Sequence, residues 1–199
     1  MLLLSNIVVP AFHDTPLVRV AEQGYRTRLL AFGLAFVAAA AVLDANGAGL
    51  VLPALFGLNA CVWPAVARAF ALRSTDPRGV EIRNLLIDSA LGGVWVALLQ
   101  FNLLACALLT VVLSCDKVIA SGWNLLLRGL IVQTAACVVT LALHGLTFAP
   151  QSSTFEILAA LPLLIAYPLA LALRLRGMGA RVEPDLPVVG ELAGDSHIA

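Results

Sequence analysis

Charged residues are scarce in this chain: they make up 12% of its 199 residues, against roughly 25% in soluble globular proteins. The twelve basic and twelve acidic side chains cancel to a net charge of zero. Because this balance offers no basic surface of the kind that binds nucleic acid, we expect no nucleic-acid partner. The four cysteines form no C-x-x-C pair, so we expect them to be packing residues and predict neither a metal site nor a disulfide framework.

Apolar residues are abundant, at 61%, and they lie in long runs separated by short polar links. With a mean hydropathy of +0.97, this composition indicates a chain that folds in lipid. The sequence therefore predicts an all-α integral membrane protein, a six-span transmembrane helical bundle. The predicted spans are residues 28–43, 49–66, 85–99, 103–120, 125–143 and 157–173.

The basic residues predict the orientation of these spans. With six spans and a cytoplasmic N-terminus, all twelve basic residues fall on the cytoplasmic side, as the positive-inside rule expects. A single helix over residues 85–114, in place of a hairpin that turns at residues 100–102, would move Lys117 and Arg128 outside. We therefore predict that both termini are cytoplasmic. The predicted regions are an N-terminal cytoplasmic tail (1–25), a six-helix membrane domain (26–173) and a short, disordered cytoplasmic tail (174–199).

Asp88 lies about one turn inside the third predicted span, and an ionisable residue within a span is a candidate functional site. Arg128 lies in the first turn of the fifth span, where the helix dipole disfavours a cation, so it needs a partner. Asp88 and Asp116 are the two acids on that membrane face that can supply one. Our hypothesis is a structural ion pair, with Asp88–Arg128 as its first form, and the alternative is a sensing or relay role.

Small residues form a ridge along the third span, where Ser89, Gly93 and Ala97 recur every four residues with Gly92 beside them. Such ridges let helix backbones approach closely in membranes. We predict that this ridge packs inside the bundle, with a dimer face as the alternative. Trp95 lies in the middle of the span, so we expect it in the protein core.

The polar segment before the third span carries its own helix start. Asp76 and Pro77 have the residue types of an N-cap and a first helical position, which predicts a short helix running into the span. Prolines within the apolar runs can kink the second and sixth spans. These are Pro53, Pro64, Pro162 and Pro168.

The stretch from Trp63 to Trp95 resembles a known family. It reads W-P-A-V-A-R, then R-S-T-D-P-R, then E-I-R-N-L-L-I-D-S-A-L-G-G-V-W, and a second block runs from Asp116 to Gly129. In order and spacing these blocks are similar to the second membrane-associated sensor (MASE) family, the membrane input module of bacterial diguanylate cyclases and some class III adenylate cyclases. The matching positions are Trp63, Pro64, Asp76, Pro77, Glu81, Asn84, Asp88, Ser89, Gly92, Gly93 and Trp95, followed by Asp116 and Arg128.

The resemblance implies a multi-pass sensory domain in the bacterial cytoplasmic (inner) membrane, with cyclic di-GMP or cyclic AMP synthesis as its output. In the family, the last span leads into the cyclase, whereas here residues 174–199 follow and contain no GGDEF motif. We therefore expect a sensory or regulatory module with no enzymatic activity and no cofactor of its own. The expected partners are membrane lipid, a second copy in a homodimer, and a separate cyclase or other cytoplasmic signalling protein.

The element expected to move on signalling is the span-three ridge together with a cytoplasmic charge layer. We define that layer as Arg68, Arg73, Arg83, Asp88, Asp116 and Arg128. A small transporter or channel is the main alternative function. Its candidate polar residues near the midplane are Asn59 and Gln133, a small set for an ion-coupled site. A structural scaffold, or a remnant that kept only its input half, is a third alternative.

Overall fold

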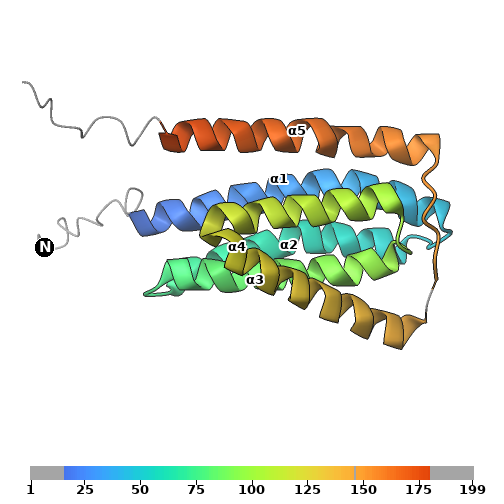
Figure 1. Ribbon diagram of the computed structural model, residues 1–199, viewed down its shortest axis with the longest axis horizontal. Coiled ribbons are helices and arrows are strands. Elements are labelled where there is room, and N and C mark those ends of the chain that lie inside the picture. Colours follow the sequence, from blue (N-terminus) through green and yellow to red (C-terminus); the bar gives the residue numbers. More distant parts are fainter. Residues whose placement is uncertain (1–15, 146, 180–199) are drawn as a thin grey trace, which may run out of the picture.

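The computed structural model describes residues 16–145 and 147–179, and these residues form a bundle of α-helices without strands (Figure 1). This confirms the predicted all-α class. In chain order the helices are α1 (Pro16–Ala45), α2 (Val51–Arg73), α3 (Pro77–Leu98), α4 (Leu103–His144) and α5 (Thr154–Gly179).

Four of these helices contain a stretch long and apolar enough to cross a membrane: α1 over residues 21–45, α2, α4, and α5 over residues 154–173. The first twelve residues of α3 include four charged side chains, and α3 is not among these four helices. The chain is therefore a helical, multi-pass membrane protein.

Helix α4 reverses direction in its middle. Ser121 (φ −156°, ψ 19°) and Gly122 (φ 71°, ψ −157°) leave the helical conformation, and Figure 1 shows the two halves of α4 running in opposite directions. The Nε2 of Gln133 donates a hydrogen bond of 3.0 Å to the Thr110 hydroxyl, which a straight helix would hold about 35 Å away. The break predicted between residues 120 and 125 is thus confirmed.

The predicted hairpin at residues 100–102 is also present, because α3 ends at Leu98 and α4 begins at Leu103. Gln100 and Phe101 both have positive φ (54° and 60°) in this turn. The side chain of Asn102 caps α4 by accepting from the backbone N–H of Ala105. A single helix over residues 85–114 is therefore excluded.

The Asp76-Pro77 helix start is confirmed as well. The carboxylate of Asp76 accepts from the backbone N–H of Gly79, with Pro77 at the first helical position. From there α3 is continuous to Leu98, so the predicted short helix and the third span are one element.

Helix α1 begins well before the predicted span, at Pro16 in place of residue 28, and so includes part of the predicted tail. Its first turns, which precede the predicted span, carry charged side chains. One of them, Glu22, forms ion pairs with Arg26 on α1 and with Arg68 on α2. Helix α5 likewise continues to Gly179, past the predicted end at residue 173. Residues 1–15 and 180–199, the outer parts of both predicted tails, lie outside the described residues.

A polar contact ties α5 to the α3–α4 turn. Asn102 is buried and donates to the carboxylate of Glu156 (2.6 Å) and to the Gln151 carbonyl oxygen. Ser153 and Glu156 form a capping box at the start of α5, each side chain accepting from the other's backbone N–H. The buried side chains of Asn102 and Glu156 are thereby satisfied at the end of the bundle opposite the Ser121-Gly122 break.

Candidate functional site

Charged side chains are buried where α1, α2 and α3 meet. The Nε of Arg28 on α1 donates to an Asp88 oxygen at 2.8 Å, and its Nη1 donates to both oxygens of Glu81 at 2.9 and 3.1 Å. The indole N–H of Trp63, on α2, donates to the other Asp88 oxygen. The Arg28 and Asp88 side chains are only 4% and 3% exposed. We call these four residues the charge cluster.

The sequence of α3 explains why this cluster forms. Glu81, Asn84 and Asp88 are spaced three and four residues apart, so they lie on one face of the helix. Asn84 is buried and donates to the Ala67 carbonyl oxygen of α2. This face therefore joins α3 to both α1 and α2 through polar contacts, and each buried carboxylate has a donor.

The predicted Asp88–Arg128 ion pair is wrong. Asp88 accepts from Arg28 and Trp63, and Arg128 is exposed on the second half of α4. Sequence reasoning assigned Arg28 to the membrane boundary because it begins an apolar run. Since α1 extends much further towards its N-terminus, Arg28 instead lies inside the bundle.

Lys117 is a second buried cation that sequence reasoning missed. It is 2% exposed, and its Nζ donates to the Leu113 carbonyl oxygen at 2.7 Å. It also interacts electrostatically with Asp88 and Asp116. Gly129 makes room for its aliphatic stem, since a Cβ there would overlap the Lys117 side chain. Its position as the only lysine, inside a predicted span, was the signal available in the sequence.

The small-residue ridge of α3 packs within the bundle, as predicted. Ser89, Gly92, Gly93 and Ala97 are all buried. A Cβ on Gly93 would overlap the backbone carbonyl of Gln133, so the two backbones touch. Gly92 faces the Leu113 side chain in the same way. The ridge thus holds α3 against both halves of α4.

The other predicted positions fall into different environments. Trp95 is in the core, as expected, and its ring lies 4.5 Å from that of Phe56 between centroids. Pro64 is buried inside α2. Of the predicted charge layer, only Asp88 belongs to the buried cluster, Asp116 is half-buried, and four members are exposed: Arg68, Arg73, Arg83 and Arg128.

The transporter candidates do not form a shared site with each other in the described part of the chain. The Gln133 side chain is used within α4, in its bond to Thr110. Asn59 is half-buried on α2, and its Nδ2 has no hydrogen-bond partner among the described residues. Over residues 16–145 and 147–179, no group of three His, Cys, Asp or Glu side chains is placed to hold a metal ion.

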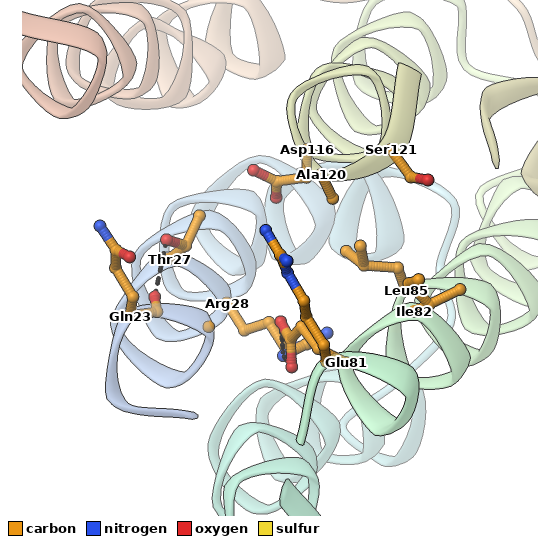
Figure 2. Close-up of a pocket in the computed structure, with 11 residues that line it drawn as sticks. Gln23, Thr27, Arg28, Glu81, Ile82, Leu85, Asp116, Ala120 and Ser121 are labelled. Carbon is orange, nitrogen blue, oxygen red and sulfur yellow. Dashed lines mark hydrogen bonds and ion pairs between the residues drawn. The ribbon is translucent and has the colours of Figure 1, made fainter. Parts of the chain in front are cut away.

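A cavity of about 320 Å³ adjoins the charge cluster, between α1, α3 and the first half of α4. Figure 2 shows Gln23 and Thr27 of α1 on one side and Asp116 of α4 on the other. Ser121, at the reversal of α4, also lines it. Arg28 and Glu81 belong to both, so the charge cluster forms part of the cavity wall.

Comparison with known proteins identifies the segment that contains the cluster. Residues 23–111 match the model of the MASE2 domain. Two proteins of Escherichia coli, from strains K12 and CFT073, are each 36% identical to this chain over 110 residues, and each is described as "Probable diguanylate cyclase DgcC". The aligned region is 55% of this chain but only 30% of each relative. No solved structure matches significantly.

The family prediction is thus confirmed for residues 23–111, which include most of α1, all of α2 and α3, and the start of α4. All four residues of the charge cluster lie within the matched segment. The second block, from Asp116 to Gly129, lies outside it.

Proposed function

We propose that this chain, whose residues 23–111 belong to the MASE2 family, is a sensory membrane module of cyclic di-GMP signalling. The observation that carries the proposal is the coincidence of the matched segment with a buried charge cluster in an otherwise apolar bundle. Ionisable residues are costly in membranes and mark functional sites there. These 199 residues supply the input, and the output is that of a cyclase domain acting downstream of them.

We further propose six membrane crossings with both termini in the cytoplasm. Helix α3 has 22 residues, which span about 33 Å and so suffice for a hydrocarbon core of about 30 Å. Helix α4 has 42 residues and reverses at Ser121 and Gly122, so each half has the length of one crossing. The α2–α3 turn and the α4 reversal lie at the same end of the bundle (Figure 1). In the sequence, Arg73 and Arg78 flank the turn, and Lys117 and Arg128 flank the reversal. The positive-inside rule makes this end cytoplasmic.

Reporter fusions test the orientation. Alkaline phosphatase fused after Gln100 is expected to be active and green fluorescent protein at the same site to be dark, because this turn faces the periplasm. After Ser74, in the α2–α3 turn, the two reporters are expected to give the reverse pattern. Equal behaviour of the two sites would contradict the proposed topology.

The charge cluster gives the bundle a means of switching between two packings. Arg28, Trp63 and Asp88 join three helices through hydrogen bonds that are either formed or broken. A stimulus that binds one packing better shifts the population towards it. The reversal of α4 lies beside the same cavity, so a shift in α1 against α3 reaches the second half of α4. The resulting change in helix packing at the cytoplasmic end is the signal that would be transmitted to a cyclase.

Co-purification tests the cyclic di-GMP assignment. The full chain carrying an affinity tag is expected to make no cyclic di-GMP from GTP when purified alone in detergent. The same chain isolated under mild conditions from its native membranes is expected to bring down a cyclase that makes it. Product from the purified chain alone would overturn the assignment as an input module. A native preparation without cyclase activity would overturn the link to cyclic di-GMP.

A further inference from the structure

The cavity beside the charge cluster has the size and lining of a ligand site. Its volume of about 320 Å³ lies at the lower end of the range of roughly 300–1,000 Å³ found for small-molecule pockets. Figure 2 shows Glu81, Ile82 and Leu85 of α3 at its wall, opposite residues of α1 and α4. Polar and apolar groups therefore line it together.

The charged side chains around the cavity favour a ligand that carries both a positive and a negative charge. Two cations, Arg28 and Arg78, and two carboxylates, Glu81 and Asp116, line it, so the ionised side chains sum to zero. Arg28 is engaged by Asp88 and Glu81, whereas Arg78 is exposed and forms no ion pair with any residue in the described ranges. A simple anion would be attracted by Arg78 and repelled by the carboxylates, while a zwitterion complements both.

An apolar groove continues from this cavity. A second space of about 320 Å³ lies between α1 and α5 and is lined mainly by Leu30, Tyr167, Ala170 and Leu171, with the exposed Arg26 at its edge. The two spaces share Gln23 and Thr27 of α1, so they adjoin on either side of these residues. A charged chamber beside an apolar groove matches the division of a phospholipid into headgroup and acyl chain.

We propose that these two spaces bind one phospholipid whose headgroup is a phosphodiester bearing a primary amine, as in phosphoethanolamine. The phosphate lies against Arg78, the ammonium group lies against Asp116 and Glu81, and an acyl chain lies between α1 and α5. The inference rests on the proposed topology, which puts this end of the bundle at the cytoplasmic headgroup layer. Because Ser121 lines the cavity, the occupant contacts α4 at its reversal.

Native mass spectrometry of the full chain, released from detergent micelles, tests the lipid. Lipids with phosphoethanolamine, phosphoglycerol and phosphocholine headgroups and identical acyl chains are added in turn. The expected result is about a tenfold preference for phosphoethanolamine, the effect of one charge-assisted hydrogen bond. Asp116→Asn is expected to abolish that preference, and Arg78→Ala to weaken retention of all three lipids. The matched control, Arg83→Ala, removes an exposed arginine of α3 that does not line the cavity and is expected to change nothing.

Several outcomes would overturn the proposal. Equal retention of the three lipids by the unchanged chain would do so, as would equal losses in Arg78→Ala and Arg83→Ala. Competition with soluble phosphoethanolamine distinguishes binding of the headgroup alone from binding of the whole lipid. If it displaced the lipid at equal concentration, the groove would contribute nothing to affinity and the lipid assignment would be wrong. Circular dichroism of each variant establishes that it is folded. The reporter fusions test the topology separately, so failure of the lipid site and failure of the topology are distinguishable.

Discussion

Replacing Arg28 by methionine is expected to lower the free energy of unfolding by about 3–5 kcal/mol, the usual cost of removing one partner from a buried ion pair. Methionine keeps much of the volume of the arginine stem but leaves the carboxylate of Asp88, only 3% exposed, without the cation that donates a hydrogen bond to it. Glu81 also loses its partner, but its side chain is 17% exposed and water can reach it. Unfolding in detergent micelles, titrated with sodium dodecyl sulfate and followed by circular dichroism, measures the change.

Two further variants separate the ion pair from packing. Asp88→Asn keeps the oxygen that accepts from Trp63 and removes the negative charge, so Arg28→Met combined with Asp88→Asn is expected to be more stable than Arg28→Met alone. Arg26→Met is the control, because Arg26 is 78% exposed and its pair with Glu22 contributes little. If Arg28→Met cost no more than Arg26→Met, the charge cluster would not stabilise the bundle.

The error over the partner of Asp88 shows what one sequence can and cannot predict about this site. Hydropathy correctly identified Asp88 as a charge inside the protein, because an acid in an apolar run is visible in the sequence. Its partner lies 60 residues away on another helix, and the sequence contains no direct signal of that distance. We chose Arg128 because it lies in the first turn of a predicted span, where the helix dipole disfavours a cation. Arg28 was the first residue of its predicted span, and helix ends marked by charged residues are poorly defined by hydropathy.

Turns in this chain were easier to predict than contacts between side chains on different helices. The reversal at Gly122 and the hairpin at Asn102 depend on local residue types, which the sequence displays directly. The extra turns of α1 instead include Glu22, which pairs with Arg68 on another helix, and a contact of this kind has no local signal in the sequence. The burial of Lys117 was not predicted for a similar reason, because it requires the space left by Gly129 on the other half of α4. The turns of this chain can therefore be predicted from local residue types, whereas contacts between residues far apart in the sequence cannot.

Gly93→Ala is expected to lower the free energy of unfolding by about 1–3 kcal/mol, although it adds a single methyl group. The added Cβ would overlap the carbonyl oxygen of Gln133 and approach the backbone N–H of Cys137. These are backbone atoms of a helix, so they cannot rotate aside as a side chain would. Relief requires α3 and the second half of α4 to separate along the ridge, which loses the close packing that holds helices together in lipid.

The loss of stability expected in two companion variants depends on which atoms the added methyl group contacts. Gly92→Ala is expected to cost less, because it meets the end of the Leu113 side chain, which can change rotamer. Gly33→Ala is the control: no heavy atom lies within 4 Å of its added Cβ, and alanine in place of glycine stabilises a helix by up to about 1 kcal/mol. The same micelle titration measures the unfolding of all three variants.

If Gly93→Ala were as stable as Gly33→Ala, α3 and the second half of α4 would not be in the close backbone contact that the structure shows. The ridge would then be a lipid-facing or dimer-facing surface, because only a surface free of backbone contacts accepts an added methyl group at no cost.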